Sequence, residues 1–147
     1  MSLEKQLFRH NVLIQVRFKD VDQMGHVNNA NHFTYFELAR VMYFNEVVNE
    51  IIEWKEQGII LAHMEIDYKR PVLLTDEVYV YSRVSKLGAK SFDVEYKIVV
   101  MENGKEVIAA SGKSVQVCFD YTNKKTINVP ELWKQKIISY EPGLQVL

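Results

Sequence analysis

The chain has 147 residues, 48% of them hydrophobic and 25% charged, which is the composition of a globular protein with a substantial core. Its net charge of −1 argues against a general attraction to nucleic acid or to anionic lipid. The single cysteine, Cys118, excludes an intrachain disulfide framework, and no apolar run approaches the roughly 18 residues that a membrane span needs. Because no signal segment opens it, the sequence predicts a cytoplasmic protein with no membrane span and no nucleic-acid partner.

The first part of the chain predicts a strand followed by a long helix. Apolar residues alternate over residues 10–19, which is typical of a strand. Turn and capping residues fill 20–29. From 29 to 48 apolar side chains recur at helical spacing around nearly the whole circumference, which predicts one long helix buried on most of its surface. A shorter helical segment through Trp54 is expected to end near Gly58.

From Ile59 onward the period of the apolar residues changes to two, which predicts a series of antiparallel strands. The expected order is a strand over 59–68, a strand from 78 to 86, a strand over 92–100, a hairpin turn at 102–105, a strand through 115–119, a turn at 122–125 and a short helix that starts near Pro130. Runs of strands beside one long helix indicate α+β architecture, with the helix against one face of the sheet, in a single domain over residues 1–147.

The segment from Asp20 to Asn29 carries the residue types best suited to chemistry. It places the carboxylate of Asp22, a glycine, a histidine and two asparagines where a strand turns into a helix. Backbone N–H groups at a helix start are unpaired, and the helix dipole favours negative charge there. A carboxylate beside such donors can attack a carbonyl while the amides hold the resulting oxyanion. The same residue types also serve as ordinary turns and caps, and this alternative stays open.

Three sequence blocks, taken together, resemble one known family. They are Arg17-Phe18-Lys19-Asp20-Val21-Asp22, Gly25-His26-Val27-Asn28-Asn29 and Tyr35-Phe36-Glu37-Leu38-Ala39-Arg40, with weaker agreement at 67–71 and at Asp76. Over residues 13–119 the chain is similar to the hotdog-fold acyl-CoA thioesterases of the 4-hydroxybenzoyl-CoA thioesterase-like superfamily. The resemblance implies an α+β hotdog fold, in which an antiparallel sheet wraps around one long central helix.

The resemblance also implies roles for individual residues. The residue matching Asp22 is a carboxylate that acts as nucleophile or as base for water, and the backbone N–H matching Asn29 donates to the thioester oxygen. His26 is the third residue expected in the catalytic site. Active sites of this fold lie between two protomers, so a homodimer or a dimer of dimers is expected. Members of the family differ at the positions of Asn29 and His26, which leaves the acyl preference and the role of His26 open.

Further residues are expected to contact the substrate. Cationic side chains recognise the phosphates of coenzyme A well, although solvated strand ends explain the same cations. Ser91 is expected to face the cleft from the partner subunit. Some hotdog thioesterases take their carboxylate from the long helix, which makes Glu37 a second candidate. The expected substrate-binding residues are Gly25, Val27, Asn28, Glu37, Arg70, Lys90 and Ser91.

Other kinds of chemistry find no support in the sequence. His10, His32 and His63 have no metal-ligand spacing, and neither a serine-hydrolase elbow nor a dinucleotide fingerprint is present. No metal and no cofactor are therefore expected, since coenzyme A is part of the substrate. The predicted function is hydrolysis of an acyl-CoA or of an acyl-carrier-protein thioester. Two alternatives remain: a hotdog acyl-thioester dehydratase or hydratase pairing Asp22 with His26, and a non-catalytic acyl-CoA-binding module.

Overall fold

The computed structural model describes residues 6–147, which form one curved, mainly antiparallel sheet and two helices of ten or more residues. The elements in chain order are β1 (His10–Ile14), a 3₁₀ turn (Phe18–Asp20), α2 (Asn31–Tyr43), a π-helical segment (Phe44–Val48), β2 (Gly58–Tyr68), β3 (Val78–Leu87), β4 (Ser91–Glu102), β5 (Lys105–Asp120), β6 (Lys125–Thr126), α3 (Glu131–Tyr140) and β7 (Gln145–Val146).

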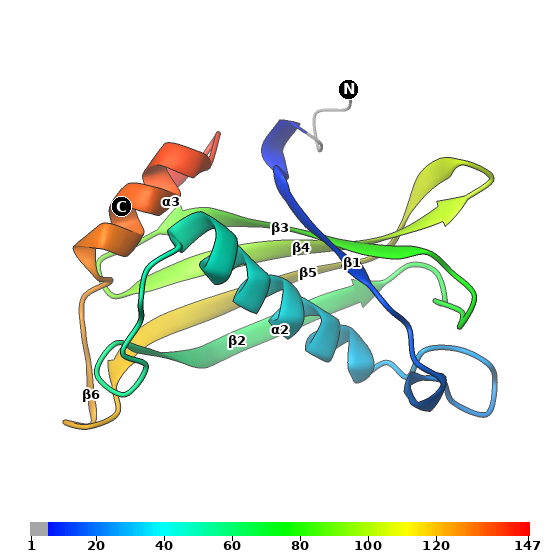
Figure 1. The fold of residues 1–147 in the computed structure, drawn as a ribbon, viewed down its shortest axis with the longest axis horizontal. Coiled ribbons are helices and arrows are strands. Elements are labelled where there is room, and N and C mark those ends of the chain that lie inside the picture. The colour runs from blue at the N-terminus through cyan, green and yellow to red at the C-terminus, as the bar shows by residue number, and fades with distance from the viewer. Residues whose placement is uncertain (1–5) are drawn as a thin grey trace.

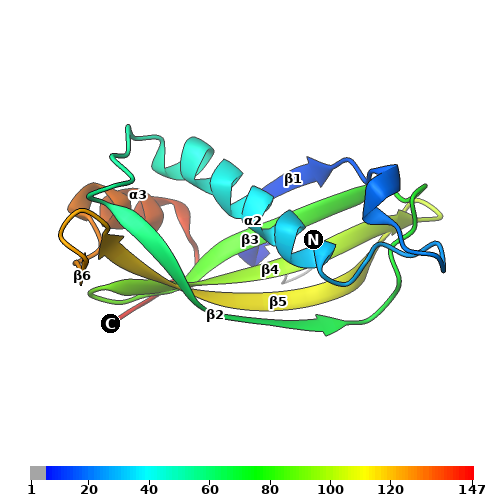
Figure 2. The ribbon, with the colours of Figure 1, turned by 90° about the horizontal axis from the view of Figure 1, so that it is seen from below.

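The sheet has the strand order β1-β3-β4-β5-β2, and every neighbouring pair in that order is antiparallel. The short strand β6 pairs with β5, and β7 pairs in parallel with β3. Figures 1 and 2 show the sheet curving around α2, which lies along its concave face. The expected α+β hotdog architecture, an antiparallel sheet around one long helix, is confirmed.

The centre of the core lies where α2 presses on the middle of the sheet. Phe36 of α2 is fully buried and stacks on Tyr96 of β4, with ring centroids 4.5 Å apart and an interplanar angle of 15°. The neighbouring residue of β5 is Gly112, which pairs with Tyr96 in the sheet register. A Cβ atom at Gly112 would lie 2.4 Å from the Phe36 ring. A glycine at this point of β5 therefore allows the helix to approach the sheet closely.

Several predicted boundaries differ from the structure. The first strand ends at Ile14, because residues 18–20 form a 3₁₀ turn in which the Asp20 carboxylate accepts the backbone N–H of Arg17 at 3.0 Å. The long helix begins at Asn31, and its π-helical continuation ends at Val48, followed by the C-cap residue Asn49, whose φ is 48°. The short helix predicted around Trp54 is a turn, and β2 begins at Gly58.

The outer face of α2 is more exposed than the sequence pattern predicts. Phe33, Leu38 and Val41 are exposed in the single chain. The expectation that this helix is buried on most of its surface is therefore wrong for one protomer, because the sheet covers only one of its faces. No helix within residues 6–147 is long and apolar enough to cross a membrane.

Candidate active site

The loop that follows the 3₁₀ turn folds back on the carboxylate of Asp22. The Asp22 backbone N–H donates to the His26 carbonyl at 2.8 Å, and the Gly25 N–H donates to the Asp22 carbonyl at 3.0 Å. Gly25 has a φ of 80°, a conformation that a residue with a side chain rarely adopts. Asp22 Oδ1 accepts the N–H groups of Met24 and His26 at 2.9 and 3.3 Å. Asp22 Oδ2 accepts no hydrogen bond from any described residue, so this oxygen of a half-buried carboxylate is available for chemistry.

Asp20, in the same loop, has a different role from that of Asp22. Its carboxylate is buried, and Oδ2 accepts the Tyr35 hydroxyl at 2.8 Å. Burial, followed by the hydrogen bond to Asp20, raises the pKa of Tyr35. The Asp20 carbonyl accepts the Asn28 N–H at 2.7 Å and Asn31 Nδ2 at 2.9 Å. Asp20 is therefore a structural residue that ties the loop to the start of α2.

Among residues 6–147, one backbone amide at the helix start has no hydrogen-bond partner. Asn28 Oδ1 accepts the Ala30 N–H at 2.9 Å in an Asx turn that immediately precedes α2, whose N-cap residue is Ala30. The Asn29 carbonyl accepts the His32 N–H at 3.3 Å and the Tyr68 hydroxyl at 2.8 Å. The Asn29 N–H donates to no acceptor among the described residues, and it lies at the positive end of the α2 dipole. This is a suitable donor for an oxyanion.

A small pocket adjoins this helix start. It has a volume of about 220 Å³ and lies between the loop before α2 and the segment that follows β2. The two segments are held together by a hydrogen bond of 2.7 Å from the Val27 N–H to the Val72 carbonyl, and by a bridge between His26 and Leu73. The residues lining the pocket are His26, Val27, Asn29, His32, Tyr68, Lys69, Arg70 and Pro71.

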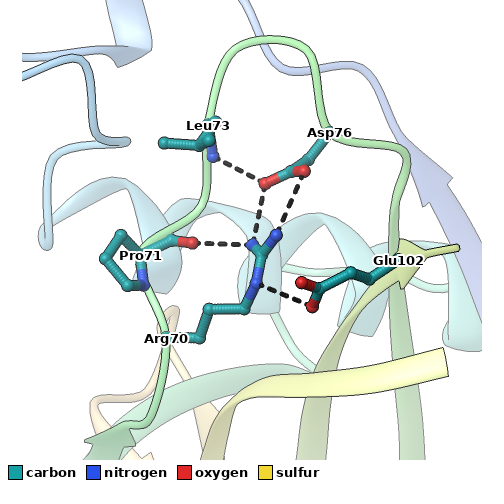
Figure 3. Close-up of polar contacts among 5 residues, drawn as sticks. All are labelled: Arg70, Pro71, Leu73, Asp76 and Glu102. Atoms are coloured by element: carbon teal, nitrogen blue, oxygen red, sulfur yellow. Dashed lines mark hydrogen bonds and ion pairs between the residues drawn. The ribbon is translucent and has the colours of Figure 1, made fainter.

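Arg70, which was expected to contact a phosphate of coenzyme A, is bonded to other residues of this chain (Figure 3). Its guanidinium donates from Nη1 to Asp76 Oδ2 at 2.9 Å and to the Pro71 carbonyl at 2.8 Å, and Nε lies 3.5 Å from Glu102 Oε2. Burial opposes ionisation of Asp76, but hydrogen bonds from Arg70 and from the Leu73 N–H lower its pKa. The charge of Arg70 is thus used to brace the turn after β2, and the phosphate contact expected of it stays a prediction.

The remaining expected site residues lie apart from the helix start. Glu37 is exposed on α2 and lines a second, larger groove of about 560 Å³ beside β2. Arg40 of the same groove makes no ion pair with Glu37; its Nη1 lies 3.4 Å from the Tyr96 hydroxyl. Lys90 and Ser91 are at the turn between β3 and β4, at the opposite end of the sheet. Within one protomer the structure does not bring Glu37, Lys90 or Ser91 to Asp22.

Two residues of this site were not predicted as functional from the sequence. Tyr68 contacts Asn29 through its hydroxyl, and His32 lines the same pocket with a fully buried ring. The signals were available: His32 lies three positions after Asn29 on a helix, and Tyr68 is part of the segment 67–71 that carries the family resemblance. No group of three or more His, Cys, Asp or Glu side chains in residues 6–147 is arranged to hold a metal ion.

Comparison with known proteins agrees with the fold. Residues 16–137 match the model of the thioesterase-like superfamily, and the chain belongs to this family. A thioesterase from Thermus thermophilus, solved in complex with coenzyme A and Zn, is 38% identical, with a TM-score of 0.77 over 91% of this chain and 95% of that one. The long-chain acyl-CoA thioesterase FadM of Escherichia coli is 25% identical over 128 residues, which are 84% of this chain and 93% of FadM.

A third relative is the uncharacterized protein YsmA of Bacillus subtilis, which is 35% identical over 83 residues. That match spans just over half of each protein, 56% of this chain and 56% of YsmA. The matches to named thioesterases confirm that this protein is a hotdog thioesterase, an enzyme of thioester hydrolysis.

Proposed function

We propose that this protein hydrolyses an acyl-CoA thioester to a free acid and coenzyme A, with Asp22 as the reacting carboxylate. One observation carries the proposal. The segment 20–29, closed by its own hydrogen bonds, holds a carboxylate oxygen at Asp22 and a helix-start amide at Asn29 that have no partner in the part of the chain that the structure describes. A thioester carbonyl needs both groups, one to deliver the nucleophile and one to stabilise the oxygen on which charge develops.

Asp22 can act by either of two routes. As a nucleophile, Oδ2 bonds to the thioester carbon, the C–S bond breaks, the thiolate of coenzyme A leaves, and water hydrolyses the mixed anhydride. As a general base, Oδ2 takes a proton from water while the hydroxide bonds to the same carbon, and the thiolate again leaves. In either route the tetrahedral oxyanion is held by the Asn29 N–H and the dipole of α2. His26, beside Asp22 in the loop, is assigned to positioning the substrate.

The relatives support the substrate class. The Thermus thermophilus thioesterase is described in complex with coenzyme A, and FadM is named for long-chain acyl-CoA. For this chain we infer an acyl-CoA substrate on the strength of both. A thioester of an acyl-carrier protein is the alternative substrate. We also propose that the protein is cytoplasmic, as the sequence predicts.

We also propose that the enzyme works as a homodimer, or as a dimer of such dimers. The strand β2 is at the end of the sheet order, so one of its edges has no partner strand in the described protomer. An exposed edge of 11 residues can pair with another chain. Beside it lie the exposed apolar residues Leu61 of β2 and Val41 of α2. A second copy that covers this face is the simplest way to bring Lys90 and Ser91 of a partner toward Asp22.

The test is a thiol-release assay over saturated and enoyl-CoA substrates, run with two variants. Asp22→Asn should lower kcat by about 100-fold or more, because a positioned acid or base contributes roughly that much. Asp93→Asn is the matched control, since Asp93 pairs with Lys113 near the far end of the sheet, and it should stay within about twofold of the parent.

Three results would contradict the proposal. Loss of the enoyl chromophore without thiol release would indicate a hydratase. Hydrolysis by Asp22→Asn within about threefold of the parent would remove Asp22 from the chemistry. Binding of acyl-CoA with no turnover by the parent protein would favour a binding module instead.

A further inference from the structure

The carbonyl of Asn29 is held by two hydrogen bonds, one of which comes from a different part of the fold. The His32 N–H donates to it at 3.3 Å as part of the first helical turn. The Tyr68 hydroxyl donates to it at 2.8 Å from the last residue of β2. Asn29 is also the residue whose N–H is assigned to the oxyanion. The edge of the sheet is thus tied directly to the peptide beside the proposed reacting centre.

The peptide unit between Asn29 and Ala30 is fixed at both of its polar atoms. Tyr68 holds its C=O, and Asn28 Oδ1 accepts its N–H at 2.9 Å. The preceding residue is fixed as well, since the Asn28 N–H donates to the Asp20 carbonyl. Peptide units are planar, so only φ and ψ of Asn29 separate its own N–H from the fixed neighbour. Holding the carbonyl therefore also limits where the Asn29 N–H points.

Tyr68 is itself firmly placed. The N–H groups of Lys69 and Arg70, which follow it, donate to the Ala109 carbonyl of β5 at 2.8 and 3.1 Å. The guanidinium of Arg70 then binds Asp76 and braces the next turn (Figure 3). A hydroxyl on a well-supported strand end can fix a partner more accurately than one on a free loop.

The His32 ring supports the Tyr68 ring. Its centroid lies 4.9 Å from that of Tyr68 at an interplanar angle of 85°, an edge-on contact. His32 is only 2% exposed, and neither ring nitrogen has a hydrogen-bond partner among the described residues. Burial lowers the pKa of His32, and partial desolvation raises that of Tyr68, which is 44% exposed, so both groups are neutral at neutral pH. The tyrosine keeps the proton that it donates.

We propose that Tyr68 is a positioning residue of the hydrolytic site, which orients the Asn29 amide toward the thioester oxygen, with His32 packed behind it. This inference rests on the proposed function, because it assigns the Asn29 N–H to the oxyanion. Donors that are already oriented need no reorganisation as charge develops in the transition state. The effect of Tyr68 should consequently fall on kcat and leave substrate binding largely unchanged.

The experiment compares Tyr68→Phe with the parent and with Tyr79→Phe in the full chain. Tyr68→Phe keeps the ring against His32 and removes only the hydroxyl. We expect kcat to fall about tenfold, less than the roughly 100-fold typical of losing an oxyanion donor outright, with KM within about twofold and an unchanged Tm. Tyr79 donates its hydroxyl to Glu77 at 2.6 Å on the protein surface, and its variant should match the parent in all three quantities.

Amide hydrogen exchange, followed by NMR, supplies a readout that does not depend on turnover. Removing the Tyr68 hydroxyl should accelerate exchange at the Ala30 and His32 amides, which are two of the bonded donors of this turn. If the parent releases no thiol from any acyl-CoA, the proposed function fails, while the exchange data still test the positioning. If the parent is active and Tyr68→Phe retains kcat within twofold, the positioning role is overturned and hydrolysis stands. A rise in KM alone, or a drop in kcat that follows a drop in Tm, also overturns it.

Discussion

Asp20 and Asp22 lie two positions apart in the chain, yet their carboxylates have different surroundings. Had the strand continued through them, both side chains would point to the same face. The 3₁₀ turn at 18–20 breaks that alternation. It buries Asp20 against Tyr35 and leaves Asp22 half-buried with one unbonded oxygen. The sequence predicts that a carboxylate at this loop does chemistry, but only the turn distinguishes a structural aspartate from the proposed reacting one.

His32 is the residue whose protonation should be visible in stability. Because burial lowers its pKa below the ordinary 6.5, the unfolded chain binds more protons than the folded one between the two values. The free energy of unfolding therefore rises with pH in that window. It falls again as the pH drops below about 6.5, and the contribution of His32 to this slope is at most about 1.4 kcal/mol per pH unit. His32→Gln should flatten this dependence between about pH 7.5 and 5.5, measured by urea unfolding.

The matched control is His63→Gln. The His63 side chain is exposed and its Nε2 lies 3.8 Å from Glu65 Oε2, so this variant should keep the slope of the parent. Groups that titrate in the opposite sense are the same in all three proteins and cancel in the comparison. Buried Glu141, whose pKa is raised chiefly by desolvation, is one of the other titrating groups that all three proteins share. An unchanged slope in His32→Gln would show that the ring is not buried in its neutral form.

At the scale of elements, the sequence predicts that α2 is a helix against the sheet but does not predict how closely it approaches the sheet. Its helical character and its position against the sheet follow from apolar periodicity. Its start is two residues later than predicted, because residues 28–30 form an Asx turn before the helix begins. The close approach of Phe36 to the sheet has no local signal, since it depends on the absence of a side chain at Gly112, 76 positions away in the chain.

Gly112→Ala tests this approach. The added methyl would be 2.4 Å from the Phe36 ring and 3.0 Å from the Glu65 carbonyl, and Phe36 cannot yield easily because it stacks on Tyr96. We expect a loss of about 1–3 kcal/mol in the free energy of unfolding, the usual cost of overpacking a core. In Gly88→Ala the nearest contact of the new Cβ would be the Ser91 carbonyl oxygen at 3.3 Å, so this variant should lose less free energy of unfolding. Equal losses in urea titrations of the two variants would contradict the argument.

At the scale of the whole molecule, the proposed dimer depends on the surface formed by β2 and the outer face of α2. Leu61→Lys places a charge on a residue that is 48% exposed in the single chain, so the protomer should still fold. If a second copy covers this residue, burying the unpaired charge is costly and the dimer should dissociate. Sedimentation equilibrium should then show monomer, with hydrolysis lost in parallel.

Ile138→Lys serves as the control for this dimer test. Ile138 is 50% exposed on α3, which is not part of the surface formed by β2 and α2, so its variant should remain dimeric and active. The dimer proposal fails if the parent sediments as a monomer, or if Leu61→Lys keeps both its partner and its activity.

The amino-acid sequence alone determined the class of this protein, because periodicity of two and about 3.6 and the compound pattern from Arg17 to Arg40 are local properties of the chain. It could not decide which cations were free, which aspartate was buried, or which side chain held the Asn29 carbonyl. Those relations join Arg70 to Asp76 and Glu102, and Tyr68 to the start of α2, across separate elements. Tertiary structure decided them, because hydrogen bonds and ion pairs form between groups that the fold brings within about 3 Å, whatever their separation in sequence.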